Sequence, residues 1–299
     1  SFFPFFLLFS SLLTNLFVVI LALLFLTQFK YVKKDILEYK VLFLLILFWF
    51  FILISLLTSI NFDHSIGRSL GFLRFIIFAY AIAYYVKLEN FRYFKIITLI
   101  WLTIFFLTSI DLLIEYIFGS DLLGNVSYMP GRLAGFLGKE LKIGNYYLAF
   151  YFLAIATLLN IFKEKKIINI FLIVFFTMIA FAIGERANFI RIFLGFLIFF
   201  SLYEKILTKY KIIIFGFLFS FVVLFVNLNE NYKVRYIDQV IKPIELGGIN
   251  YYLKKHPYGA HFSTAFNIFK EYPVKGIGLK NFYYECWKDK YIDKKYAFN

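Results

Sequence analysis

The sequence predicts an all-α membrane protein, a polytopic bundle of transmembrane helices with one large polar loop. Hydrophobic residues make up 62% of the 299 residues and aromatic residues 23%, and the mean hydropathy is +0.79. A soluble domain contains about 45–50% apolar residues and could not bury this excess. Apolar runs close to 20 residues long recur along the chain, which is the length needed to cross about 30 Å of hydrocarbon. We therefore expect the protein to lie in a lipid bilayer.

The apolar runs divide the chain into a transmembrane domain over residues 1–227 and a polar loop domain over residues 228–299. The first domain contains one partial span at 1–9 and eight full spans, which we place at 11–29, 41–60, 70–86, 96–118, 145–162, 167–183, 189–204 and 212–227. The sequence begins with Ser1 inside an apolar run and ends at Asn299 inside a polar stretch. We therefore expect it to be an internal piece of a longer protein.

The loops between the predicted spans alternate in positive charge, and this alternation predicts the orientation of the helices. One set of loops carries thirteen basic residues: Lys30, Lys33, Lys34, Lys40, Lys87, Arg92, Lys95, Lys163, Lys165, Lys166, Lys205, Lys209 and Lys211. The loops between them carry six: Arg68, Arg132, Lys139, Lys142, Arg186 and Arg191. Because the more basic loops stay in the cytoplasm, residues 228–299 are expected on the opposite side. The net charge of +14 is thus explained by helix orientation, without a nucleic-acid partner.

The basic residues of the external loops are the main candidates for a binding site. They lie in three segments together with one acid: Arg68 and Arg74 in GRSLGFLRF, Arg132, Lys139 and Glu140 in MPGRLAGFLGKELKIGNYY, and Arg186 and Arg191 in IGERANFIR. Any single arginine could instead extend to the membrane surface or pair with Glu140 or Glu185. As a group they favour an anion site, because the guanidinium fork fits phosphate oxygens and keeps its charge. The neighbouring glycines would let the backbone approach a lipid phosphate or pyrophosphate: Gly131, Gly135, Gly138 and Gly184.

The polar loop contains a short amphipathic helix, HFSTAFNIFKEY, which we expect to begin at His261. Its predicted apolar face is formed by Phe262, Ala265, Phe266 and Phe269. The helix could lie on the membrane or cover a cavity, and packing against the bundle is the simpler alternative. His261 is a candidate general base or hydrogen-bond donor, or else a solvated residue at a helix start. His64, beside Asp63, is a weaker candidate.

We expect neither a metal ion nor an organic cofactor. The three histidines, His64, His256 and His261, have no set of carboxylates spaced around them as metal ligands. The single cysteine, Cys286, excludes an internal disulfide framework. The sequence contains no P-loop and no dinucleotide fingerprint, so an ATP-driven machine is not supported.

Four segments resemble the bacterial family of O-antigen ligases and polymerases, which are membrane glycosyltransferases. RSLGFLRFIIFAYAI resembles the family's fourth span, and GRLAGFLGKELKIGNYYLAFY resembles its Arg-x-x-Gly-x-x-Gly-x-Glu stretch. IGERANFIR resembles the Gly-Glu-Arg start of the eighth span, and AFNIFKEYPVKGIGLKNF resembles the helix, Pro, Gly-x-Gly, Phe signature of the large periplasmic loop. The resemblance covers most of residues 60–285.

The resemblance implies transfer of glycan from an undecaprenyl-pyrophosphate carrier at the periplasmic face of the bacterial inner membrane, without a metal or a nucleotide sugar. The acceptor would be lipid A–core for a ligase and another glycan for a polymerase. Arg186 matches the family's essential arginine, which is expected to hold the pyrophosphate, and Arg132 and Lys139 would assist it. His261 stands where the family often has an arginine. The family's catalytic histidine lies in a His-x-His-Asn type motif, and none of the 299 residues matches that motif.

A transporter or flippase for an anionic lipid would also need an arginine-lined cavity. Such proteins commonly have paired halves with broken helices near the midplane of the membrane. Here the charges gather at one face, and the two halves of the sequence show no similarity. An enzyme is therefore favoured over a transporter, and the ligase and the polymerase both stay open.

Overall fold

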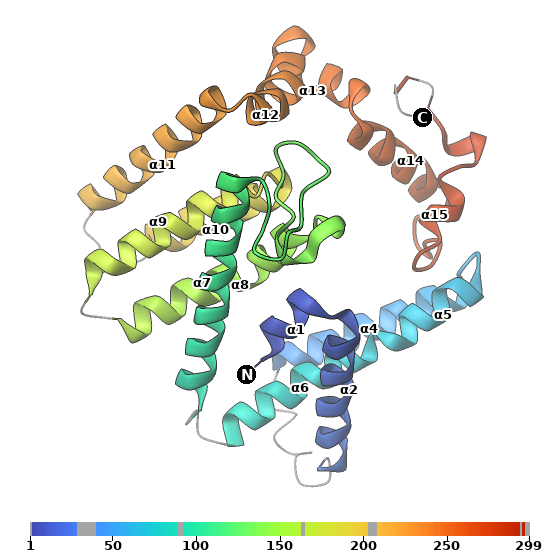
Figure 1. Ribbon diagram of the computed structural model, residues 1–299. Coiled ribbons are helices and arrows are strands. Elements are labelled where there is room, and N and C mark those ends of the chain that lie inside the picture. Colours follow the sequence, from blue (N-terminus) through green and yellow to red (C-terminus); the bar gives the residue numbers. More distant parts are fainter. Residues whose placement is uncertain are drawn as a thin grey trace. The chain divides into compact units, whose positions relative to one another are not determined.

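The computed structural model describes residues 2–28, 40–88, 93–162, 165–202, 208–293 and 295–296. Every regular element among them is a helix, which confirms the all-α prediction (Figure 1). The elements are α1 (Phe3–Phe9), α2 (Ser11–Thr27), α4 (Lys40–Leu57), α5 (Phe62–Gly71), α6 (Leu73–Leu88), α7 (Phe94–Phe118), η1 (Gly135–Glu140), α8 (Ile143–Ile161), α9 (Lys166–Ala182), α10 (Arg186–Leu202), α11 (Thr208–Leu228), α12 (Glu230–Lys233), η2 (Val234–Ile241), α13 (Lys242–Lys255), α14 (Pro257–Glu271), α15 (Phe282–Glu285) and η3 (Asp289–Tyr291). Part of the orientation prediction lies outside the described residues, namely Lys30, Lys33, Lys34, Arg92, Lys163 and Lys205.

Four of the described helices are long and apolar enough to cross a membrane, which indicates a membrane protein. They are Phe62–Lys87, Phe94–Phe118, Ile143–Ile161 and Lys211–Leu228. The first joins α5 and α6, so this helix begins eight residues before the predicted span at 70–86. It begins there because the side chain of Asn61 accepts a hydrogen bond from the backbone amide of His64 at 3.4 Å and caps the first turn.

The chain forms two compact units, and each is described by itself. The first unit combines Ser1–Thr14 with Phe91–Asp238, and the second combines Asn15–Asn90 with Gln239–Asn299. The second unit therefore contains the helices from α4 to α6 together with residues 239–299. These residues are most of the polar segment that the sequence predicted as a separate domain from residue 228 onward.

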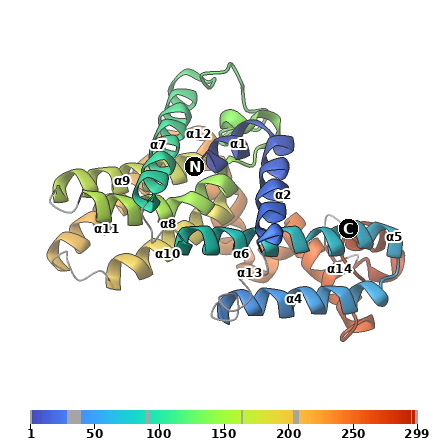
Figure 2. The same cartoon turned by 90° about the horizontal axis from the view of Figure 1, so that it is seen from below.

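In the first unit, α7 crosses α8 and α9 at a steep angle, and α11 lies beside α9 (Figures 1 and 2). The largest fully buried side chains in this core are aromatic: Tyr147, Tyr151, Phe105, Phe176, Phe196 and Phe200. The hydroxyl group of Tyr147 lies 2.9 Å from that of Ser109. These tyrosines can be buried because hydroxyl groups on neighbouring helices satisfy their polar atoms.

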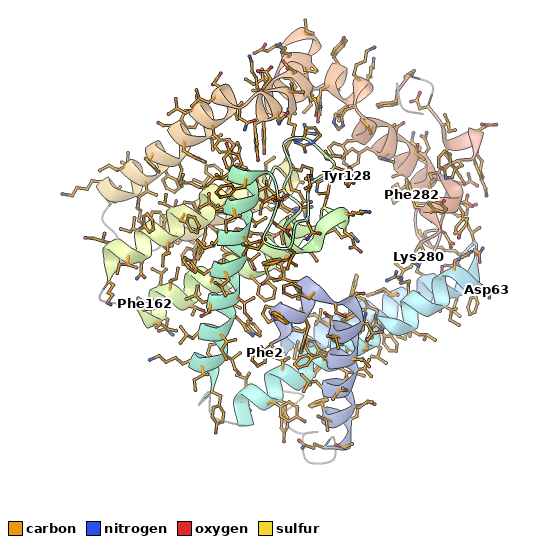
Figure 3. The ribbon with its side chains drawn as sticks, viewed as in Figure 1. Phe2, Asp63, Tyr128, Phe162, Lys280 and Phe282 are labelled. Carbon is orange, nitrogen blue, oxygen red and sulfur yellow. The ribbon has the colours of Figure 1, made fainter. Side chains whose placement is uncertain are left out.

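In the second unit, the segment Gly276–Asn281 is hydrogen-bonded to the turn between α4 and α5, and we call it the anchor segment. The buried amide of Asn281 donates to Ser59 Oγ at 2.7 Å and to Ser65 Oγ at 3.2 Å. Gly278 has a φ of 85°, and a Cβ atom there would overlap the side chain of Ser59. Figure 3 shows Lys280 and Phe282 beside the end of α5 that carries Asp63. The Gly-x-Gly signature thus permits a close backbone approach.

Helix α14 begins at Pro257, so the prediction that it starts at His261 is wrong. The His256 side chain accepts a hydrogen bond from the Tyr258 amide at 3.3 Å and caps the helix, which therefore begins four residues before the expected position. The helix is amphipathic in an unexpected sense. Its buried side carries small or medium-sized side chains: Ala260, Thr264 and Ile268. The predicted apolar face, including Phe262 at 70% exposure and Phe266 at 56%, is open.

Candidate anion-binding site

The site is organised by the turn between α9 and α10, at Gly184. This glycine has a φ of 74°, and a Cβ atom there would overlap the carbonyl oxygen of Gly131. The adjacent amide of Leu133 donates to the carbonyl of Ile183 at 3.1 Å. Two loops that are about 50 residues apart in the sequence thus touch through their main chains. This contact positions Arg132, which follows Gly131 directly, and Arg186, which lies two residues after Gly184.

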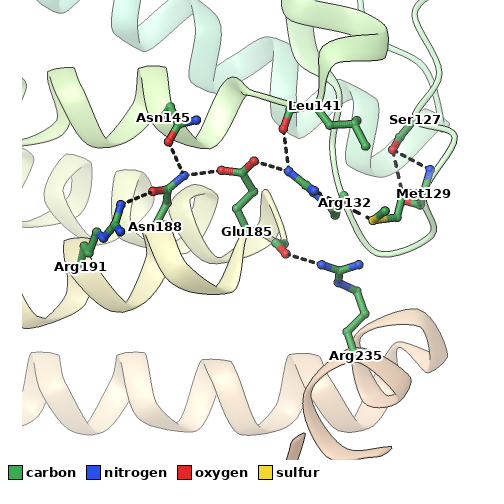
Figure 4. Close-up of polar contacts among 10 residues, drawn as sticks. Ser127, Met129, Arg132, Leu141, Asn145, Glu185, Asn188, Arg191 and Arg235 are labelled. Carbon is green, nitrogen blue, oxygen red and sulfur yellow. Dashed lines mark hydrogen bonds and ion pairs between the residues drawn. The ribbon is translucent and has the colours of Figure 1, made fainter. Parts of the chain in front are cut away.

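Arg132 is held between a backbone carbonyl and a carboxylate (Figure 4). Its Nη2 donates to the Leu141 carbonyl at 2.6 Å and forms an ion pair with Glu185 Oε1. The side chains of Arg132 and Glu185 are 20% and 12% exposed, so this pair is largely shielded from water. Removing both charges from water costs free energy, which the ion pair offsets together with the further hydrogen bonds of Arg132 to Leu141 and of Asn188 to Glu185.

The polar network continues along α10 through Asn188 (Figure 4). Its amide donates to Glu185 Oε2 and, at 3.0 Å, to Asn145 Oδ1. Its carbonyl oxygen accepts a longer hydrogen bond from Arg191 Nη1 at 3.4 Å. Arg191 is exposed and lies at the edge of the network.

Arg235 is a third arginine of the site, contributed by η2 after the last long apolar helix. Its Nη2 donates to the Gly184 carbonyl at 3.0 Å, and its own carbonyl accepts a hydrogen bond from Arg186 Nη1 at 2.9 Å. Its aliphatic chain also fills the space beside Gly131 that a Cβ atom would need. These contacts fasten η2 to the turn between α9 and α10.

The cluster carries more positive than negative charge. Three guanidinium groups, on Arg132, Arg186 and Arg235, lie at the turn around Gly184, and that of Arg132 is ion-paired with Glu185. Burial, followed by the charges of Arg186 and Arg132, lowers the pKa of Arg235. The Nε atoms of Arg132 and Arg235 are buried and have no hydrogen-bond partner within the described part of the chain. An anion would relieve the repulsion and could use these donors, because guanidinium binds oxyanions with several N–H groups at once.

Buried acids at the end of α7 hold the loop that carries Arg132. The Glu115 carboxylate accepts hydrogen bonds from the amides of Ala134 at 2.8 Å and Gly135 at 2.8 Å. One turn earlier, Asp111 Oδ1 accepts a hydrogen bond from the Leu122 amide at 2.9 Å. Sequence reasoning missed Asp111, Glu115 and Arg235. The two acids did give a signal, since acids four residues apart in an apolar helix share one face and are costly in a membrane.

A cavity of about 170 Å³ adjoins the arginine cluster. It lies between the end of α7, the loop before η1 and the beginning of α12, and Arg132 lines it. Other polar side chains on its wall are those of Glu115, Ser127, Asn229 and Asn231.

The predicted site residues of the first unit divide into two groups. Arg132, Arg186 and Arg191 belong to the network, whereas Lys139 and Glu140 are exposed on η1. Of the two acids considered as arginine partners, Glu185 pairs with Arg132, and Glu140 pairs with Lys142 at 2.9 Å. The position that a Cβ atom would take beside each predicted glycine is occupied by protein atoms: Gly184 meets the carbonyl of Gly131, whereas Gly135 meets Ile143 and Gly138 meets Asn125. Gly131 and Gly184 thus bring two loops together.

Arg68, Arg74 and His261 belong to the second unit, and their part in this site stays a prediction. Arg68 and His261 are exposed. The Arg74 guanidinium lies 4.8 Å from the centre of the Phe75 ring. Among the residues described, no group of three or more His, Cys, Asp or Glu side chains could hold a metal ion.

Comparisons with known proteins assign no family to the chain: no family model, no curated protein and no solved structure matches it. Function is therefore inferred from the geometry of the arginines and from the resemblance of the sequence motifs.

Proposed function

We propose that this chain belongs to a membrane glycosyltransferase of the O-antigen ligase type. The enzyme would transfer glycan from an undecaprenyl-pyrophosphate carrier to lipid A–core at the periplasmic face of the bacterial inner membrane. The observation that supports this proposal is the meeting of Arg132, Arg186 and Arg235 at the turn between α9 and α10, where Glu185 is ion-paired with Arg132. Three cations with spare N–H donors suit a ligand with two linked phosphate groups.

In the proposed reaction, negative charge would develop on the diphosphate, which the arginines would bind. A hydroxyl oxygen of the acceptor would form a bond to the anomeric carbon of the donor sugar. The bond from that carbon to the pyrophosphate would break, and undecaprenyl pyrophosphate would leave with the electron pair. Arg186, together with Arg132 and Arg235, would stabilise the charge on the leaving diphosphate, because preorganised donors stabilise developing charge. The proton of the hydroxyl would pass to a base. His261, the candidate from the sequence, belongs to the second unit, and its role stays a prediction.

Replacing Arg186 tests this proposal in the full-length protein. Arg186→Ala should abolish glycan transfer while the amount of protein in the membrane is unchanged. Arg186→Lys should restore little activity, since a point charge does not replace the planar fork. Lipopolysaccharide gels measure the transfer, and an immunoblot of the membrane fraction measures the protein. Normal surface glycan in the alanine variant would refute the pyrophosphate-binding role.

A polymerase of the same family would use the same arginines, because it cleaves the same bond of the donor. Deletion of the gene separates the two activities on a lipopolysaccharide gel. Loss of all capped chains indicates the ligase, and capping by a single repeat unit indicates the polymerase. A flippase is less well supported, because Arg132 and Arg186 lie in a loop and at the start of a helix, away from the middle of a span.

A further inference from the structure

The cavity beside Arg132 is built from three chain segments that also hold the arginine cluster in place. Glu115 and Tyr116 contribute from the last turns of α7, Ser127 from the following loop, and Asn231 from α12. Arg132 lines the cavity and also contacts Glu185, so the cavity and the arginine cluster share this side chain. A ligand bound at the arginines could therefore extend into the cavity without leaving the protein surface.

The volume of the cavity indicates the size of the group that fits inside it. A cavity of roughly 150 Å³ holds a benzene molecule, whereas pockets for drug-sized ligands begin at roughly 300 Å³. The cavity measures about 170 Å³. It therefore has room for about one six-membered ring inside its walls.

The wall of the cavity combines polar and apolar side chains and is nearly neutral. The carboxylate of Glu115 is already occupied by the amides of Ala134 and Gly135, which leaves little of its hydrogen-bonding capacity for a ligand. The side-chain amide of Asn231 makes no hydrogen bond within the described residues, and the Tyr116 hydroxyl makes only a long one of 3.4 Å with Asn229. Amides and hydroxyls both donate and accept hydrogen bonds, as the hydroxyl groups of a sugar do.

We infer that this cavity is a subsite for one sugar ring, the ring joined to the diphosphate of the donor lipid. The inference rests on the proposed function and adds the position of the sugar to it. The diphosphate lies against Arg186 and Arg235, Arg132 contacts both parts, and the ring hydroxyls meet Asn231 and Tyr116. A second phosphate group is a poorer occupant, because Arg132 is the one cation among the described residues that line the cavity.

Binding to the full-length protein in lipid nanodiscs tests the subsite with two probes. One is polyprenyl diphosphate carrying a single hexose, and the other is the same polyprenyl diphosphate without sugar. Asn231→Ala should weaken binding of the sugar-bearing lipid by about two- to tenfold, the range for one lost hydrogen bond. The dissociation constant of the sugar-free lipid should not change.

A matched control variant lies four residues earlier in the chain. Asn227 is exposed, and its amide donates to the Val223 carbonyl of its own helix at 2.8 Å. It does not line the cavity, so Asn227→Ala should leave both dissociation constants unchanged. Tyr116→Phe removes a second hydroxyl from the wall and should act on the sugar-bearing lipid alone, as Asn231→Ala does.

The outcomes separate the subsite from the proposed function. Equal losses for both lipids, or no loss for either lipid in both cavity variants, would overturn the sugar subsite while leaving the diphosphate site intact. Failure of the wild-type protein to bind either lipid would overturn the proposed function and the subsite with it. Unchanged binding of the sugar-free lipid by Arg186→Ala would overturn the role of the arginines alone.

Discussion

Gly184→Ala tests whether the arginine site depends on main-chain contact between two loops. The native φ of 74° is unfavourable for alanine, and the left-handed region costs about 1–2 kcal/mol for an L-residue with a Cβ atom. The added atom would also overlap the Gly131 carbonyl oxygen, and forcing an extra carbon into a packed site costs about 1–3 kcal/mol. The expected loss of stability is therefore about 2–5 kcal/mol.

The assay is thermal unfolding of the detergent-purified protein, followed by intrinsic fluorescence. A loss of this size should lower the melting temperature by about 4 °C or more. The same variant should bind inorganic pyrophosphate more weakly, because the displaced loops carry Arg132 and Arg186. Gly216→Ala is the control, since Gly216 lies within α11 and a Cβ atom there would meet nothing within 4 Å.

Two results would refute the reasoning about Gly184. An unchanged melting temperature in Gly184→Ala would show that the two loops do not press against each other. A lower melting temperature with unchanged pyrophosphate binding would show that the contact is structural and does not position the arginines. The free energy of unfolding of Gly216→Ala should differ from that of the wild type by no more than about 1 kcal/mol, which is the difference between alanine and glycine in a helix.

Two further predictions concern residues that the sequence did not single out. Arg235→Ala should weaken pyrophosphate binding by about tenfold or more, which is the effect of a lost charged hydrogen bond. The control Lys233→Ala, on the neighbouring turn, should leave binding unchanged. Equal affinities of the two variants by titration calorimetry would exclude Arg235 from the site. Asn281→Ala should release the anchor segment, because it removes hydrogen bonds to Ser59 and Ser65 at a cost of about 1–3 kcal/mol. Trypsin should then cleave faster after Lys275 and Lys280, and an unchanged cleavage rate would contradict the anchoring role.

Composition and periodicity predicted the helices of this chain well. The predicted span at 96–118 corresponds to α7 (Phe94–Phe118), and the span at 145–162 corresponds to α8 (Ile143–Ile161). Apolar runs of this length have few alternatives, so their ends can be placed from the charges and turn formers around them. Caps were harder to see: Asn61 and His256 start their helices one or two turns before the apolar pattern becomes clear.

The site was only partly foreseeable for a different reason. Charge placement singled out Arg132 and Arg186, which loop parity predicts on the same side of the membrane, and the structure brings their loops into contact. Arg235 gave no such signal. It reaches the site only because the chain after α11 folds back onto the turn at Gly184, and the sequence pattern does not indicate this fold. The role of Gly184 was also hidden, since a glycine that admits a ligand and a glycine that admits another backbone look the same in a sequence.

The open face of α14 has a consequence for handling the polar segment on its own. Phe262, Phe266 and Phe269 are 70%, 56% and 55% exposed on this helix, and the Lys270 ammonium lies 4.6 Å from the centre of the Phe266 ring. Contiguous exposed aromatic rings make a protein self-associate in water. A fragment that contains α14 without a lipid or detergent phase should therefore form oligomers as its concentration rises, and a mild detergent should return it to the monomer.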